Sequence, residues 1–237
     1  VKKNFMIITV LLLCVFVFVQ SIYGVGLLVF GTPTLLLMGH SFDDALGLLL
    51  PSSLAISSHQ IISSHSSEID EVKLIPLAIF GIPIGLLLTM KWLDETDLSV
   101  QMGCIMLVAA LIRSNKKMQK SFSDGLKRAR LLFHFLNAIF HGMTNLGGAF
   151  LPVYSNSVYG EKIRAVRCTA LFYVVYAFAQ ITTLVAIEKY NSLKHGLMLL
   201  PVLLLFYWVA GQRSFKIIAD QTFNLVATFF LWSMAVV

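Results

Sequence analysis

Two apolar stretches of the sequence are each interrupted by glycines that lead into a proline. The stretches read YGVGLLVFGTP over residues 23–33 and NLGGAFLP over residues 145–152. Glycine adopts backbone conformations closed to other residues and proline lacks an N–H donor, so we expect helices to be broken there. A helix that starts after such a break presents unpaired N–H groups and about half a positive charge, which suits a small anion. The candidates for this backbone site are Gly24, Gly26, Pro33, Asn145, Gly147, Gly148 and Pro152.

Polar side chains inside the apolar stretches are further candidates, because burial in hydrocarbon is costly for them. His134 and His141 lie seven residues apart, two turns along one helical face, with Asn137 close by. They could bind substrate or relay protons, or they could only hydrogen-bond to neighbouring helices. The other candidates have structural alternatives. Ser52 and Ser53 could only satisfy a kink at Pro51, and Arg167 could snorkel to the interface. Gln20 and Gln180 are weaker candidates by the same argument as the serines.

These residues lie in a chain with the composition of a membrane protein. Of the 237 residues, 57% are hydrophobic and 13% are charged, and the mean hydropathy is +0.82. Soluble domains carry about 25% charged residues. The apolar blocks are longer than the ~10 residues of a barrel strand, so we predict an all-α polytopic membrane protein. About eight transmembrane segments are expected, at 5–38, 45–62, 74–90, 98–112, 131–159, 168–187, 196–212 and 219–237.

Two of these segments are too long for one helical crossing. Residues 5–38 are 34 residues without a charge, and residues 131–159 are 29 residues without Lys, Arg, Asp or Glu. At ~1.5 Å per residue, unbroken helices of these lengths would exceed a ~30 Å hydrocarbon core. Each contains one glycine interruption, and Gly26 and Gly147 are 121 residues apart. This spacing predicts two related halves, a transmembrane repeat over 1–112 and another over 131–237, in parallel or inverted orientation.

The positive charge is concentrated between these halves. The net charge is +6, and seven of the 18 Lys and Arg residues lie between Arg113 and Arg130, together with a single acid, Asp124. Beside a membrane span, this pattern predicts a basic cytoplasmic loop over 113–130 and no nucleic-acid partner, with a lipid-binding patch as the alternative. The first apolar run is expected to be a retained span, since no cleavage site follows it. Four crossings before the loop would then place the N-terminus in the cytoplasm as well.

Other site chemistries find little support in the sequence. Cys14, Cys104 and Cys168 lie far apart, which indicates neither a disulfide framework nor a metal site. The motifs of zinc proteases, serine hydrolases and nucleotide-binding enzymes do not occur. We therefore expect a non-enzyme without cofactors. No Asp or Glu is evident inside a span, so histidine is the titratable option for coupling to H⁺, and Na⁺ is the other candidate coupling ion.

The interrupted motifs resemble those of the sulfite exporter TauE/SafE family of membrane permeases. In each of two halves, that family carries a glycine-rich motif running into a proline, approximately G-x-G-G-G-x-x-x-x-P. NLGGAFLPVYS resembles the second copy and GVGLLVFGTPTLLL resembles the first. Leu27 and Leu28 stand where further glycines are expected, and Asn145 replaces a glycine.

The resemblance implies a permease of a bacterial inner membrane that moves sulfite, a sulfonate or a related small anion. The expected mechanism is alternating access, with the small anionic substrate held between the two halves in the lipid bilayer. A homo-oligomer is an open alternative to a monomer. A transporter of another small solute or of a metal ion, and a non-transporting membrane scaffold, are the alternative functions.

Overall fold

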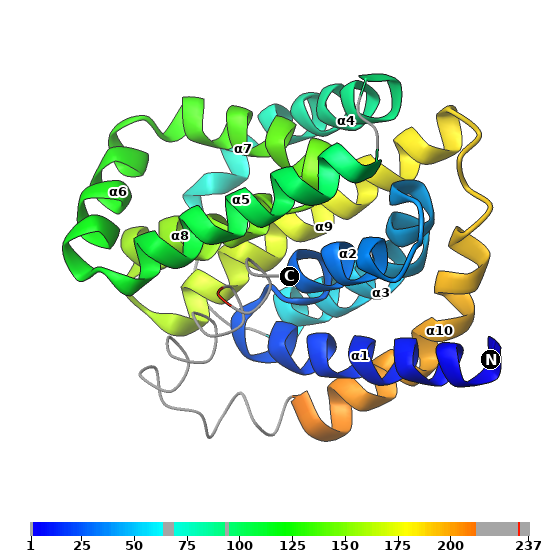
Figure 1. Ribbon diagram of the computed structural model, residues 1–237. Coiled ribbons are helices and arrows are strands. Elements are labelled where there is room, and N and C mark those ends of the chain that lie inside the picture. The colour runs from blue at the N-terminus through cyan, green and yellow to red at the C-terminus, as the bar shows by residue number, and fades with distance from the viewer. Residues whose placement is uncertain (1, 64–68, 93–94, 212–231, 233–237) are drawn as a thin grey trace.

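The computed structural model describes residues 2–63, 69–92, 95–211 and 232, and within these ranges the chain is helical without a β-strand (Figure 1). The α-helices are α1 (Lys2–Tyr23), α2 (Leu27–Leu37), α3 (Phe42–Ser63), α4 (Ile75–Trp92), α5 (Glu95–Ser114), α6 (Lys116–Arg128), α7 (Arg130–Thr144), α8 (Leu151–Tyr159), α9 (Lys162–Ala186) and α10 (Leu193–Phe206). Short 3-10 turns η1 (Asp70–Leu74) and η2 (Gly147–Ala149) precede α4 and α8, and a π turn η3 (Tyr207–Gly211) extends α10. The expected last span, 219–237, lies outside the described residues apart from Trp232.

Helix α1 ends at the first glycine interruption, and the chain reverses there. A Cβ atom placed on Gly26 would lie 2.7 Å from the backbone nitrogen of Gln20 and 2.8 Å from the carbonyl oxygen of Phe16. The rings of Phe16 and Phe30 have their centroids 6.1 Å apart. Helix α2 therefore turns back beside α1, and the two form a helical hairpin (the first hairpin), whereas the sequence suggested an interruption within a single crossing.

The second interruption has the same arrangement. Gly147 lies against the backbone of Asn137 and the Cβ atom of His141. The rings of Phe140 in α7 and Phe150, the last residue of the turn, have centroids 6.2 Å apart. Helices α7 and α8 therefore form the second hairpin, with residues 145–150 at its turn.

The helices that follow the two hairpins run in opposite directions. Asp43 at the start of α3 forms an ion pair of 3.6 Å with Lys189, which lies just after the end of α9. Helix α4 packs on α7 and α9, while α10 with η3 packs on α1 and α3. If α1–α4 and α7–α10 are taken as two series of four helices, the fourth helix of each series contacts the first and third helices of the other.

Small residues allow the closest of these contacts. A Cβ atom on Gly85 of α4 would lie 1.9 Å from the carbonyl oxygen of Ile139, and one on Gly142 of α7 would lie 2.3 Å from that of Ile82. Thr89 donates a hydrogen bond of 2.9 Å to the carbonyl oxygen of Met143. Close backbone approach through small residues is typical of helices that pack in membranes.

Four stretches of the described residues are long and apolar enough to cross a membrane, namely 42–63, 70–92, 162–186 and 193–211. They correspond to α3, η1–α4, α9 and α10–η3. Shorter apolar helices cover 7–22, 27–37 and 100–112. The structure therefore gives a multi-pass helical protein with four candidate spans in its described part, and the eight predicted segments remain a prediction.

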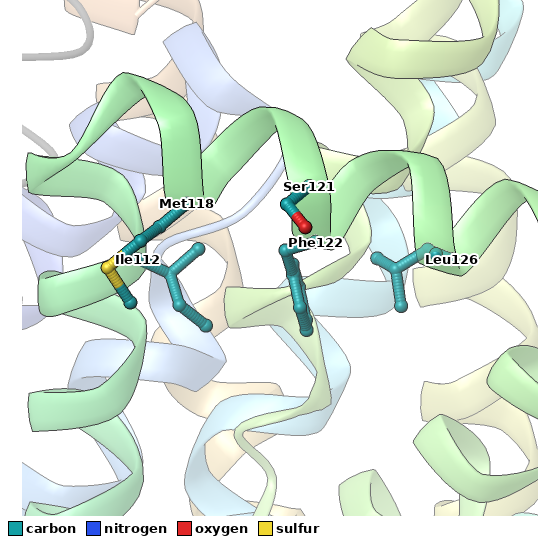
Figure 2. Close-up of a pocket in the computed structure, with 6 residues that line it drawn as sticks. Ile112, Met118, Ser121, Phe122 and Leu126 are labelled. Carbon is teal, nitrogen blue, oxygen red and sulfur yellow. The ribbon is translucent and has the colours of Figure 1, made fainter.

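The basic segment predicted as a loop contains helix α6. Asn115 caps its first turn, since the Asn115 Oδ1 atom accepts hydrogen bonds from the N–H groups of Lys117 (2.9 Å) and Met118 (3.2 Å). Figure 2 shows Met118, Phe122 and Leu126 pointing to one side of α6, where they line an open surface pocket of about 550 Å³ together with Ile112 of α5. An amphipathic helix with one basic and one apolar face therefore separates the two halves.

Helix α6 and the N-terminal end of α1 lie at opposite ends of the bundle (Figure 1). The sequence interpretation had placed both on the cytoplasmic side, because it counted four crossings before the basic segment. In the structure α2 turns back beside α1, and α3, α4 and α5 then run the length of the bundle in alternating directions. The first five helices therefore lead from one end of the bundle to the other.

Candidate functional site

The turn of the first hairpin is built from residues without polar side chains. Gly24 has a left-handed backbone (φ 72°), and its N–H group donates to the carbonyl oxygen of Gln20 at 2.8 Å. A Cβ atom on Gly24 would lie 3.3 Å from Val166 and 3.5 Å from Thr169, both in α9. Glycine is needed here both for the backbone conformation and for the close contact with the second half.

Gln20 satisfies the polar groups around this first turn. Its Oε1 atom accepts a hydrogen bond of 3.2 Å from the N–H group of Leu27, the first residue of α2. Its Nε2 atom donates to the hydroxyl of Ser57 at 3.2 Å, and its carbonyl oxygen accepts from Nε2 of Gln60 at 2.9 Å. The N-terminus of α2, which the sequence suggested as an anion site, is thus partly capped by the protein itself.

Asn145 shapes the turn of the second hairpin and joins it to both halves. Its backbone is left-handed (φ 63°), a conformation that asparagine tolerates better than most residues. Its Nδ2 atom donates to the hydroxyl of Thr32 in α2 at 2.7 Å, and its Oδ1 atom accepts from Nε2 of Gln180 in α9 at 3.3 Å. Asn145, Thr32 and Gln180 are all buried. The second turn is therefore fixed against the returning arm of the first hairpin.

Gly148 provides room for an aromatic side chain of α9. A Cβ atom on Gly148 would lie 1.4 Å from the hydroxyl oxygen of Tyr173, so that hydroxyl lies directly on the glycine backbone. Tyr173 is fully buried, and its hydroxyl has no hydrogen-bond partner among the described residues. A buried donor without a partner is rare, and it marks this position as one where a ligand or an ordered water can bind.

His141 lies beside the same turn and is likewise buried without polar partners. It is 0% exposed, and neither Nδ1 nor Nε2 has a hydrogen-bond partner in the part of the chain that the structure describes. Its ring centroid lies 4.5 Å from that of Tyr176 and 5.6 Å from that of Tyr173. A neutral imidazole offers one N–H donor and one acceptor. Two residues on neighbouring helices therefore hold unused donors next to Gly147 and Gly148.

Ser52 and Ser53 are fully buried in α3, and their hydroxyls have no partner among the described residues. Ser57, one turn after Ser53, bonds to Gln20, so this part of α3 passes the first hairpin turn. Side chains four residues apart share a helical face, which places Ser53 toward the first hairpin. The alternative, that these serines donate to carbonyl groups freed by a kink at Pro51, is not seen, because neither hydroxyl forms a hydrogen bond within the described part of the chain.

The two prolines occupy different positions. Pro152 is the second residue of α8, where its missing N–H group removes no helical hydrogen bond. Pro33 lies inside α2, seven residues after Gly26, and is buried. Arg167 is partly exposed in the first third of α9 and follows Val166, which packs on Gly24. Of the predicted site residues, the structure thus places His141, Asn145, Gly147 and Gly148 around one turn.

Several residues near this turn were not predicted from the sequence. Thr32, Tyr173 and Tyr176 are buried, and Asn137 donates to the Tyr176 hydroxyl at 3.0 Å. The only available signal was the spacing of Tyr173 and Tyr176, three residues apart on one face of an apolar helix. A group of three or more His, Cys, Asp or Glu side chains suited to a metal ion does not occur among the described residues. The arrangement is suited to hydrogen-bond donation to a ligand.

The comparisons with known proteins identify a family. The family model of the sulfite exporter TauE/SafE matches residues 8–237, which is nearly the whole chain. No curated protein and no solved structure matches it. The family is one of membrane transporters that act on sulfur anions, which agrees with the multi-pass helical fold. The chain therefore belongs to the sulfite exporter TauE/SafE family.

Proposed function

We propose that this protein moves sulfite, or a sulfonate of similar size, across the membrane, and that the anion binds at the turn of the second hairpin. The observation that carries the proposal is the pair of buried, unpartnered groups beside η2, the imidazole of His141 next to Gly147 and the hydroxyl of Tyr173 next to Gly148. An oxyanion accepts hydrogen bonds from both. Such a ligand would supply the partners that these side chains otherwise lack.

Backbone donors complement these side chains. No described hydrogen bond uses the N–H groups of Gly147 or Gly148, whereas those of Leu146, Ala149 and Phe150 are paired within the turn. Free N–H groups before a helix are a common way to bind anions without a buried Lys or Arg. The anion would therefore be held by donors from η2, α7 and α9.

Alternating access is the mechanism that the arrangement of the helices supports. We infer that the two halves are inverted repeats, because α3 and α9 are antiparallel and the fourth helix of each half packs on the first and third helices of the other. The two hairpins enter from opposite ends of the bundle and meet where Asn145 bonds to Thr32. Rocking of one half against the other would open this meeting point to each side in turn.

The positive-inside rule gives the proposed orientation. α6 carries five of the Lys and Arg residues of the chain, which places it at the cytoplasmic face of a bacterial inner membrane. The N-terminal end of α1 would then lie at the opposite face (Figure 1). Labelling of single cysteines introduced into α6 and at the N-terminus, in intact and in opened cells, tests this orientation.

The transport assay uses purified protein in liposomes and labelled sulfite, with sulfate, a sulfonate and chloride as competitors. The interior and exterior are kept at pH 7.5 so that little sulfite crosses the lipid as neutral sulfur dioxide. We expect saturable uptake that Asn145→Leu and Gly147→Leu abolish, while Gly125→Ala, in open space on α6, retains it. Absence of saturable uptake of each of these anions by folded wild-type protein would reject the proposed substrate class.

A further inference from the structure

A glutamate that lies between two of the expected transmembrane segments, 45–62 and 74–90, is buried in the structure. Glu71 lies in η1, immediately before α4, and only 3% of its surface is exposed. It belongs to the apolar stretch 70–92 that is long enough to cross a membrane. A carboxylate in such a place is costly unless it is paired, hydrogen-bonded or protonated, and it marks a functional site by default.

Its partners are two tyrosines of α8, the returning arm of the second hairpin. The Tyr154 hydroxyl donates to Oε1 of Glu71 at 3.2 Å, and the Tyr159 hydroxyl donates to Oε2. In the part of the chain that the structure describes, Glu71 forms no ion pair with Lys, Arg or His. Phenol donors satisfy the oxygens of a carboxylate but do not cancel its charge. A proton is therefore the simplest species that can neutralise Glu71.

The groups around this pair connect it to α7, the first arm of the second hairpin. The His134 ring of α7 lies edge-on to Tyr154, with centroids 4.7 Å apart, and its Nε2 atom is buried without a partner among the described residues. Among the described residues, the other titratable or charged groups facing the two tyrosines are Arg130 of α7, Cys168 of α9 and Arg164, whose guanidinium lies 4.8 Å from the Tyr159 ring centroid. Glu71 thus contacts α8 directly and reaches α7 through Tyr154.

We propose that Glu71 binds the proton that couples transport to the proton gradient, an inference that rests on the proposed transport function. The ionised carboxylate accepts from both phenols and holds α8 against η1. On uptake of one proton, the neutral acid becomes a donor through one oxygen, so one of its two phenol bonds must reorient. Movement of the second hairpin is thereby tied to the protonation state of Glu71, and the proton is taken up in one orientation and released in the other.

The test compares two transport modes in liposomes that contain wild type, Glu71→Gln or Tyr159→Phe. Exchange of labelled for unlabelled sulfite at equal pH requires only binding and reorientation. Accumulation driven by a pH difference of one unit, imposed with either polarity between pH 7 and 8, also requires proton coupling. One-to-one coupling supports about tenfold accumulation for each pH unit.

We expect Glu71→Gln, which keeps an acceptor oxygen but cannot ionise, to exchange sulfite within about threefold of wild type and to lose pH-driven accumulation completely. Tyr159→Phe removes one of the two phenol donors and keeps the carboxyl group, so exchange should continue while pH-driven accumulation falls without being lost. Accumulation by Glu71→Gln at the wild-type level would overturn the proposal. So would loss of exchange as well as accumulation in this variant, or wild-type exchange without any pH-driven accumulation. Absence of exchange in wild type would instead reject the proposed transport function.

Discussion

The two hairpin turns are built alike but differ in how their polar groups are used. Gln20 and His141 occupy corresponding positions, 121 residues apart, on the first arm of each hairpin. Gln20 bonds to Leu27 and Ser57 through its side chain. His141 has no hydrogen-bond partner for either ring nitrogen among the described residues. The polar side chain at the first turn is therefore paired within the protein, whereas the one at the second turn has no partner among the described residues.

The difference assigns separate tasks to the two hairpins. On the proposed function the first hairpin serves as a scaffold, because its glycines allow close contact with α9 and Gln20 satisfies the start of α2. Its departures from the family motif, Leu27 and Leu28, are fully buried apolar residues and serve packing. The second hairpin carries the proposed substrate site. Substitutions should therefore impair stability at the first turn and transport at the second.

The largest effect is expected from Gly148→Leu. The new side chain would occupy the position of the Tyr173 hydroxyl, which lies 1.4 Å from the added Cβ atom, and Tyr173 is too deeply buried to move aside easily. We expect no measurable sulfite uptake. Gly125→Leu is the matched control, because a Cβ atom on Gly125 meets nothing within 4 Å. Wild-type uptake by Gly148→Leu would show that the contact between η2 and α9 is dispensable.

His141→Leu should impair transport without loss of stability. It removes two buried nitrogen atoms that lack protein partners, so the apolar replacement leaves no new unsatisfied group. We expect sulfite uptake to fall by a factor of about 10 or more, as for loss of a charge-assisted hydrogen bond, while the apparent Tm in detergent is unchanged or higher. A fall in Tm with normal uptake would reverse the assignment of the two hairpins.

Gln20→Leu should show the opposite pattern. It leaves the N–H group of Leu27 without its acceptor and removes the donor to Ser57, both in buried surroundings. An unsatisfied buried group costs about 1–3 kcal/mol, so the apparent Tm should fall clearly. Uptake per folded molecule should stay close to wild type. Uptake lost at full stability would place the substrate at the first hairpin instead.

The smallest effect is expected from Thr32→Val, which tests the contact between the hairpins. This nearly isosteric change removes the acceptor of the 2.7 Å hydrogen bond from Asn145. The cost should be about 1 kcal/mol, and uptake should decline by a factor of about 5. Thr182→Val, at an exposed position in α9, is the control. Equal uptake and Tm in both variants would indicate that the hairpins move independently.

The sequence was sufficient for the family and for the helical membrane character. Long apolar blocks have few structural solutions, and the glycines at 147 and 148 with Pro152 carry a recognisable motif. It was not sufficient for the direction of the chain after each interruption. Glycine permits many turn angles, and the reversal depends on contacts such as Phe16 with Phe30 that no local pattern encodes.

Two further features of the structure differ from the sequence prediction, each for an identifiable physical reason. Glu71 is buried by tyrosines 83 and 88 residues away, so nothing in its polar neighbourhood indicates burial. The basic segment does contain a helical signal, because Met118, Phe122 and Leu126 are spaced four residues apart. The density of positive charge favoured a loop, whereas an apolar stripe allows the same residues to form α6.

The most direct test of the account is calorimetric titration of sulfite into the purified protein in detergent, with His141→Leu and Gln20→Leu measured beside wild type. The account predicts that wild type and Gln20→Leu bind sulfite with similar affinity, while His141→Leu binds it at least about tenfold more weakly. Equal affinity in His141→Leu, or loss of binding only in Gln20→Leu, would contradict the placement of the substrate at the second hairpin.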